Sequence, residues 1–194
     1  MMNFLDILLL SIALAMDCFT VSIISGVILK EMRWGVITRM SFFFGLFQAA
    51  MPFIGWLGTK HFAQYIEAFD HWIAFGLLAF LGIRMIKESF EDDEDKHFNP
   101  TKIKTQLVLA VATSIDALAV GISFACTGYT SIGELCFPLW AIGIVSFLFG
   151  IIGNLLGIRF GSSIRKRLKP DLFGGIILII IGVKILLSHL LGYH

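Results

Sequence analysis

The sequence predicts an all-α integral membrane protein in which six transmembrane helices form two three-helix repeats of inverted topology. Composition is the first reason: 57% of the 194 residues are hydrophobic and only 15% are charged, with a mean hydropathy of +0.87. Long apolar runs are the second reason, and a motif that occurs in both halves of the chain is the third. Soluble domains carry about 25% charged residues, so we expect the function to lie inside the membrane.

Six apolar runs come close to the roughly 20 residues that a membrane-spanning helix needs. None shows the period-2 alternation of a membrane β-barrel strand. The runs cover residues 4–29, 40–59, 71–87, 105–127, 137–158 and 172–191. They divide the chain into a first repeat over 1–90, an acidic cytoplasmic linker over 91–104 and a second repeat over 105–194.

The first and fourth runs are the most informative, because each has an aspartate near its middle. Asp17 lies within residues 10–23 and Asp116 within residues 109–122, and Leu, Ala, Val and Ile recur around both. A carboxylate near the bilayer centre costs roughly 3 kcal/mol on insertion scales, so it is rare without a function. A structural hydrogen bond between helices is the alternative, but such bonds average only about 0.6 kcal/mol. The matched pair predicts a binding site for a cation or a proton.

The repeat extends beyond the two aspartates. Residues 41–45 parallel residues 146–150, and residues 82–86 parallel residues 182–186. Chance similarity between apolar helices is the alternative explanation. Because a unit of three helices crosses the membrane an odd number of times, the second unit enters from the opposite side. Many secondary transporters use such inverted repeats to build a midplane site with alternating access.

Basic residues are concentrated in the first, third and fifth loops, whereas the opposite side has only Lys60, apart from Lys184 inside the last run. The positive-inside rule therefore places these three loops in the cytoplasm and both termini outside. The basic residues are Lys30, Arg33 and Arg39 in the first loop, Arg84, Lys87, Lys96, Lys102 and Lys104 at the third, and Arg159, Arg165, Lys166, Arg167 and Lys169 at the fifth.

Two hydroxyl groups lie near the aspartates. Thr20 is three residues on the cytoplasmic side of Asp17, and Thr113 is three residues on the cytoplasmic side of Asp116, since the two helices run in opposite directions. Both hydroxyls could line the inner approach to the site. Hydrogen bonding of each hydroxyl to its own helix is equally open.

Two amides could add neutral oxygen ligands. Pro52 removes the hydrogen bond to the backbone carbonyl of Gln48, so position 48 offers both a carbonyl and an amide oxygen. Asn154 supplies an amide at nearly the matching place of the fifth run, in a stretch rich in glycine. Each amide is either a ligand or a helix–helix hydrogen-bonding group.

This set of oxygens favours a hard divalent cation. Carboxylate, amide, carbonyl and hydroxyl oxygens suit Mg²⁺, Ca²⁺ and Mn²⁺. All five histidines fall in loops or near the ends of runs, which argues against zinc or copper. Met16 and Cys18 flank Asp17 and could add sulfur, which would favour Mn²⁺. Neighbouring helical residues point about 100° apart, however, so only one of them could share the face of Asp17.

The remaining charged features have simpler readings. The acidic run at 91–95 is expected to be a solvated linker, with weak metal capture or sensing as the alternative. The basic run at 165–167 is expected to touch anionic lipid rather than nucleic acid. Arg84 and Lys184 are expected to extend towards their nearest membrane surface. We expect no cofactor, and the sequence leaves the oligomeric state open.

Five short motifs follow one another along essentially the whole chain. They are Ala-Met-Asp-Cys-Phe at 15–19, Pro-Phe-Ile-Gly-Trp at 52–56, His-Trp-Ile-Ala-Phe at 71–75, Ala-Thr-Ser-Ile-Asp-Ala at 112–117 and Gly-Gly at 174–175. Together they resemble the MntP family of bacterial manganese efflux pumps, although a sporulation-associated membrane family shares the aspartate motif. The resemblance implies a six-helix fold with two related halves, a bacterial cytoplasmic membrane location, and Asp17 and Asp116 as the membrane aspartates that matter. Cys18 departs from the usual Ala, and Gln48 stands where some members have Glu, which lowers the negative charge of the site.

We therefore expect export of Mn²⁺ by alternating access, through a site built by Asp17 and Asp116 and assisted by Gln48 and Asn154, with protons as the coupled ion. Export of another divalent cation, or a non-transporting membrane sensor or scaffold, is the alternative. An intramembrane aspartyl protease also needs two membrane aspartates, but there Gly-x-Gly usually precedes the second, whereas Thr-Ser-Ile precedes Asp116. No enzymatic activity is expected.

Overall fold

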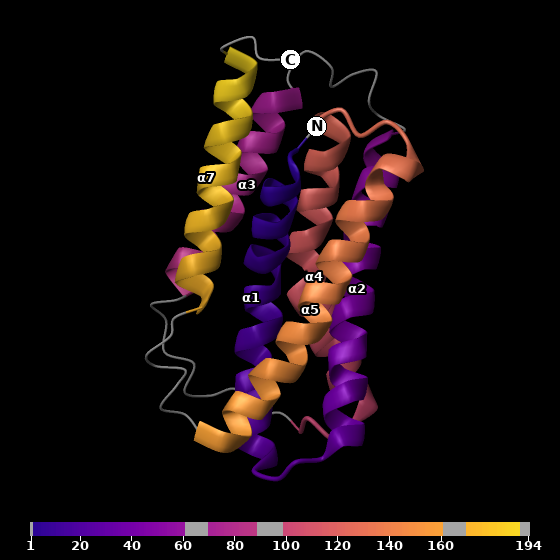
Figure 1. Ribbon diagram of the computed structural model, residues 1–194, viewed down its shortest axis with the longest axis vertical. Coiled ribbons are helices and arrows are strands. Elements are labelled where there is room, and N and C mark those ends of the chain that lie inside the picture. The colour runs from indigo at the N-terminus through magenta and orange to yellow at the C-terminus, as the bar shows by residue number, and fades with distance from the viewer. Residues whose placement is uncertain (1, 61–69, 89–98, 161–169, 191–194) are drawn as a thin grey trace.

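The computed structural model describes residues 2–60, 70–88, 99–160 and 170–190 (Figure 1). Within these ranges the chain forms helices and no strand. The helices are α1 (Phe4–Leu29), α2 (Trp34–Lys60), α3 (Asp70–Glu88), α4 (Ile103–Cys126), α5 (Ile132–Phe160) and α7 (Pro170–Leu190). The predicted all-helical class is confirmed for these residues. The acidic run at 91–95 and the basic run at 165–167 lie outside them.

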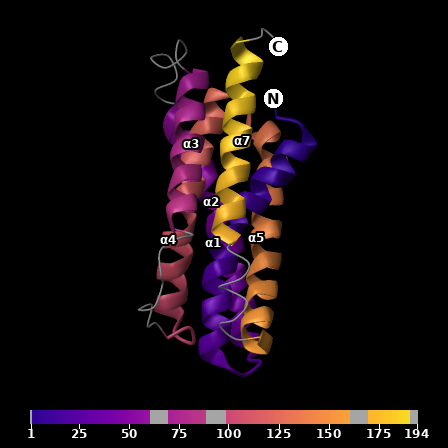
Figure 2. The ribbon, with the colours of Figure 1, turned by 90° about the vertical axis from the view of Figure 1, so that its left-hand side faces the viewer.

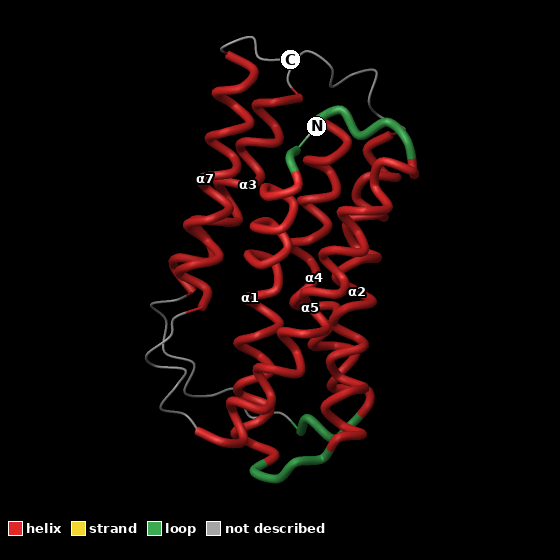
Figure 3. The backbone as a smooth tube through the Cα atoms, in the orientation of Figure 1, coloured by secondary structure: helices red, strands yellow, loops and turns green. Residues whose placement is uncertain are grey.

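The helices run lengthwise in an elongated bundle (Figures 1 and 2). α1 begins and α7 ends at the same end, which we call the upper end as drawn in Figure 1; residues 127–131 connect α4 to α5 there. Residues 30–33 connect α1 to α2 at the opposite, lower end, where α4 also begins (Figure 3). α1 and α4, the helices with the two aspartates, therefore run in opposite directions.

Helices from the two halves of the sequence are interleaved in the bundle. α1 packs mainly on α5 and also on α7, whereas α4 packs mainly on α2 and also on α3. α2 also contacts α5, and α3 contacts α7. The two closest pairs, α1 with α5 and α2 with α4, each join a helix from before residue 91 to a helix that begins at residue 103 or later.

Glycines allow the close approach within these two pairs. A Cβ atom on Gly157 of α5 would collide with the carbonyl oxygen of Ile23 on α1. In the other pair, a Cβ atom on Gly121 of α4 would collide with the carbonyl oxygen of Pro52 on α2. Only glycine lets the backbones come this near.

Large side chains close the upper half of the bundle. The indole N–H of Trp56 donates to the backbone carbonyl of Tyr129 at 2.6 Å, and the Phe124 and Tyr129 ring centroids lie 5.0 Å apart. All three side chains are buried. This contact ties α2 to the connection at 127–131.

Four of the described helices are long and apolar enough to cross a membrane: Phe4–Leu29, Trp34–Thr59, Ile103–Cys126 and Ile132–Phe160. α7 contributes a shorter apolar stretch, Ile176–Leu187. Within the described residues these lengths indicate a multi-pass membrane protein. The crossing of the membrane by all six helices stays a prediction.

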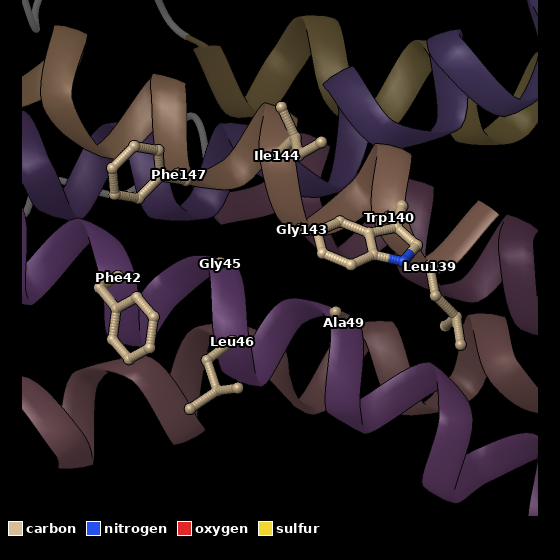
Figure 4. A pocket seen from close by; sticks show the side chains of 9 residues that line it. All are labelled: Phe42, Gly45, Leu46, Ala49, Leu139, Trp140, Gly143, Ile144 and Phe147. Carbon is tan, nitrogen blue, oxygen red and sulfur yellow. The ribbon is translucent and has the colours of Figure 1, made fainter. Parts of the chain in front are cut away.

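The outward face of α2 and α5 is apolar, as a membrane requires. A groove of about 360 Å³ runs between these helices (Figure 4). It is lined by Phe42, Gly45, Leu46, Ala49, Leu139, Trp140, Gly143, Ile144 and Phe147. Trp140 is 68% exposed and Phe42 is 56% exposed. A continuous apolar surface of this kind is unusual on a soluble monomer but matches contact with lipid chains.

The fifth helix begins earlier than predicted, at Ile132 rather than at residue 137. The Glu134 carboxylate accepts the backbone N–H groups of Thr130 at 2.9 Å and Ser131 at 3.2 Å. These bonds satisfy free donors at the helix start. Polar capping therefore extends the helix beyond the apolar run, and Pro138 does not end it.

Candidate functional site

The two aspartates lie on helices that meet in the middle of the bundle. Cys18, the residue after Asp17, donates its thiol to the hydroxyl of Thr113 across a distance of 3.7 Å. Thr113 is less than one turn from Asp116 on α4. This contact sets the two aspartates at neighbouring levels of two antiparallel helices. Asp116 is 4% exposed, and Asp17 is half-buried.

Gln48 reaches the helix of Asp17. Its side-chain N–H donates to the backbone carbonyl of Leu14 at 2.8 Å, and Leu14 lies nearly one turn above Asp17. The other amide atom, Oε1, is fully buried and has no hydrogen-bond partner among the described residues. Gln48 thus places a buried oxygen without a hydrogen-bond partner among the described residues next to α1, above the level of Asp17.

Asn154 lies on the lower side of the aspartates. Its side-chain N–H donates to the carbonyl of Gly150 on its own helix at 2.9 Å, and its Oδ1 has no hydrogen-bond partner among the described residues. A Cβ atom on Gly26 would collide with the backbone oxygen of Asn154, so this part of α5 faces the last turns of α1. The structure therefore places the two amides on opposite sides of Asp17 along the bundle axis.

The two threonines are buried in the same region. Thr113 donates to the carbonyls of Leu109 and Ala110, at 3.0 and 3.2 Å. Of the two alternatives for the threonine hydroxyls, Thr113 therefore shows hydrogen bonding to its own helix. Thr20 is 7% exposed, one turn below Met16 on α1.

The donor set is dominated by oxygen. Among the described residues, no group of three or more His, Cys, Asp or Glu side chains could hold a metal ion. Cys18 is directed at Thr113, so its sulfur faces the helix of Asp116. Two carboxylates with neutral oxygens around them can bind a hard divalent cation or exchange it for protons.

Four buried serines of this bundle were not predicted as site residues. They are Ser22, Ser41, Ser123 and Ser146, whose hydroxyl oxygens have no hydrogen-bond partner among the described residues. A signal for two of them was present, because Ser41 and Ser146 begin the two aligned Phe-rich motifs at 41–45 and 146–150.

Comparison with known proteins identifies the relatives of this chain. The family described as "Putative manganese efflux pump" matches residues 31–186. A relative from Bacteroides fragilis, "Putative manganese efflux pump MntP", is 56% identical over 190 residues, which cover 97% of this chain and 98% of the relative. Relatives of the same name from Phocaeicola vulgatus and Gloeothece citriformis are 54% identical over 189 residues and 44% identical over 190 residues; each match covers 97% of this chain, and 98% and 97% of those relatives. No solved structure gives a significant match.

The long apolar helices and these relatives define a multi-pass membrane transporter rather than an enzyme. The chain belongs to the MntP family of manganese efflux pumps. The family inferred from the short sequence motifs is thereby confirmed.

Proposed function

We propose that this chain exports Mn²⁺ from the cytoplasm by alternating access, with Asp17 and Asp116 as the charged ligands. The observation that carries the proposal is the contact of Cys18 with Thr113, since it sets two membrane aspartates at neighbouring levels of adjacent helices. Two carboxylates neutralise a divalent cation, and protonation relieves their repulsion when the cation leaves. The relatives are named as manganese efflux pumps, which supports Mn²⁺ as the ion.

The helix arrangement supports an inverted repeat. In an inverted repeat α1 corresponds to α4, α2 to α5 and α3 to α7. The contact between α1 and α5 then corresponds to the contact between α4 and α2, and the contact between α1 and α7 corresponds to that between α4 and α3. All four contacts are present. An inverted repeat of this kind allows one half to move relative to the other around a central site.

The lower end of the bundle is the cytoplasmic end in this proposal. Residues 30–33 and the start of α4 lie there, and they carry Lys30, Arg33, Lys102 and Lys104. The positive-inside rule then puts the start of α1 and the end of α7 outside. The bacterial source of the relatives supports the bacterial cytoplasmic membrane as the membrane of this proposal.

Export needs an energy source. Moving a divalent cation outward against 100 mV costs roughly 4.6 kcal/mol, twice the single-charge value. The sequence has no nucleotide-binding motif, so we propose proton antiport at the same aspartates. Export should then stop when a protonophore collapses the proton gradient. Export that continues at an unchanged rate would exclude this coupling.

The first test measures cell manganese in an exporter-deficient bacterium under manganese stress. The intact chain should lower cell manganese, and Asp17→Asn and Asp116→Asn should each abolish the effect at equal membrane expression. Glu31→Gln is the matched control, because Glu31 is an exposed carboxylate of the connection between α1 and α2. If the intact chain leaves manganese unchanged, the same assay with Mg²⁺, Ca²⁺ and other divalent cations decides between another exporter and a sensor. Active aspartate variants would show that the site is wrong.

A further inference from the structure

Six buried side-chain atoms have no hydrogen-bond partner within the part of the chain that the structure describes. They are the hydroxyl oxygens of Ser22, Ser41, Ser123 and Ser146, Oε1 of Gln48 and Oδ1 of Asn154. None of these residues is more than 3% exposed. Such atoms are rare in folded proteins because an unpaired buried oxygen loses its interaction with water and gains nothing in return.

Other serines of the same bundle behave differently. Ser11 donates to the carbonyl of Ile7 at 2.7 Å, and Ser25 donates to that of Val21 at 2.9 Å. Both are fully buried on α1, the helix that also carries Ser22. Bonding to the preceding turn is thus available to a buried serine here, and the four unpaired serines do not use it.

The six atoms divide equally between the two halves of the chain. The first half contributes a serine on α1 and a serine and an amide on α2; the second contributes a serine on α4 and a serine and an amide on α5. Each atom therefore has a counterpart of the same chemical type on the equivalent helix. Two related halves of one ion path would carry such matching groups. Unpaired atoms buried by chance would have no reason to match between the two halves.

Three of the atoms gather around one turn of α5. The Ser41 hydroxyl lies 2.8 Å from the position that a Cβ atom would take on Gly150, and the Ser22 Cβ lies 2.8 Å from the corresponding position on Gly153. Asn154 ends this turn and donates to the carbonyl of Gly150. Ser22 follows Asp17 along α1, so the group formed by Ser22, Ser41 and Asn154 extends from the aspartates towards the lower end.

The other three atoms extend from the aspartates towards the upper end. Gln48 bonds to the carbonyl of Leu14, above Asp17. Ser123 lies seven residues beyond Asp116 in the direction of the upper end. Ser146 lies one turn above Gly150 on α5, because α5 begins at the upper end. The next residue, Phe147, has its Cβ 3.1 Å from the position of a Cβ on Gly45 of α2.

We propose that these two groups line the two halves of the path along which a hard divalent cation moves to and from Asp17 and Asp116. This inference rests on the proposed function. Hydroxyl and amide oxygens can replace water molecules around such a cation, and because they carry no charge they release it again. The helices are closed over these oxygens in the present conformation. Each group gains its partners, the cation and its remaining water, when its own side of the bundle opens.

The test compares unpaired serines with paired ones in purified protein reconstituted into liposomes. Ser41→Ala and Ser146→Ala should each lower Mn²⁺ transport at low Mn²⁺ by about tenfold, the effect of losing one hydrogen-bonding ligand to a charged group. Ser11→Ala and Ser25→Ala are the controls and should stay within about twofold. The melting temperatures of the Ser41 and Ser146 variants should be unchanged or higher, because each change removes an unpaired buried oxygen. Lowered melting temperatures with normal transport would show that these hydroxyls are structural.

A second measurement does not depend on transport. In a chain with Cys18, Cys126 and Cys136 replaced by Ala, Ser22→Cys should react with a membrane-impermeant thiol reagent from the lower side, and Ser123→Cys from the upper side. Labelling from opposite sides without any Mn²⁺ transport by the intact chain would overturn the proposed function and keep the path. Transport by the intact chain with neither position labelled, and with Ser41→Ala and Ser146→Ala as active as the controls, would overturn the path and keep the function.

Discussion

Lys184 of α7 donates to both carboxylate oxygens of Asp6 at the start of α1, at 2.6 and 2.5 Å. The Asp6 side chain is only 12% exposed, and the Lys184 side chain is 53% exposed. Asp6 also accepts the backbone N–H of Asn3, which caps α1. We expected the Lys184 side chain to extend towards its nearest membrane surface, and the structure shows that its ammonium group pairs with Asp6. When the two aspartate motifs are aligned, Thr105 occupies the position that corresponds to Asp6, so the second half of the chain has no aspartate there.

Removing either partner should destabilise the upper end by different amounts. Lys184→Ala should lower the free energy of unfolding by about 0.5–1 kcal/mol, because the Lys184 side chain is half-exposed to its surroundings. Asp6→Ala should lower it by about 1–2 kcal/mol, since the helix cap is lost as well. Thermal unfolding in detergent measures both, and Lys87→Ala, an exposed lysine of α3, is the control. Equal losses for the two variants would contradict the capping role of Asp6.

The hydrogen bond between Trp56 and Tyr129 should stabilise the upper half. Trp56→Phe keeps an aromatic ring but leaves a buried carbonyl without its donor, so we expect a loss of about 1–3 kcal/mol in unfolding free energy. Ile54→Val is a control on the same helix, because Ile54 is 53% exposed. A Trp56→Phe variant as stable as the intact protein would mean that the carbonyl of Tyr129 finds another donor.

Burial raises the pKa of Tyr129 above its ordinary value of 10.0. Because the unfolded chain ionises first, the stability contributed by the neutral phenol is present below pH 10 and is lost as the pH rises above it. Unfolding free energies measured from pH 9 to 11 should therefore fall more steeply for the intact protein than for Tyr129→Phe. Parallel curves for the two proteins would contradict the raised pKa.

The glycine contacts predict opposite effects for two similar substitutions. Gly157→Ala should destabilise the protein by about 1–3 kcal/mol or more, because its Cβ would collide with the backbone of α1. Gly76→Ala in α3 is the matched control: nothing lies within 4 Å of its Cβ position. There alanine should stabilise the helix by about 0.5–1 kcal/mol. Thermal unfolding of the two variants checks both signs.

A carboxylate at position 48 should tighten ion binding. Affinity for a hard divalent cation rises with the number of charged oxygens around it, so Gln48→Glu should bind Mn²⁺ about tenfold more tightly or better. Turnover should fall, since release becomes slower. Gln48→Leu should weaken binding instead. Equilibrium binding and transport measured on the same preparations test this, and a Gln48→Glu variant that binds like the intact chain would place residue 48 outside the site.

The positions of the helices could be predicted because the membrane demands long apolar runs. α1 has the predicted limits, and α4 agrees within two residues. The largest differences are at the starts of α2 and α5, which lie at Trp34 rather than residue 40 and at Ile132 rather than residue 137. At α5 the Glu134 carboxylate caps the helix start. Hydropathy does not record such capping.

The partners of individual side chains were harder to predict. Asp17 and Asp116 could be paired because matched motifs in antiparallel helices suggest one shared level. The bonds of Gln48 to Leu14 and of Lys184 to Asp6 join residues 34 and 178 positions apart, and they depend on helix rotations that a sequence pattern does not specify. The close pairing of α1 with α5 likewise depends on which faces of the helices carry the glycines.

The interleaving of the helices bears on how the protein is made. Since α1 has its main partner in α5, and α2 in α4, a chain released after the first three helices has inserted without the neighbours that bury its small-residue faces. Assembly must therefore be completed late in synthesis, and fragments of the pump should be substrates for membrane proteases. Residues 1–90 and 105–194 made as separate chains should accumulate only when they are produced together.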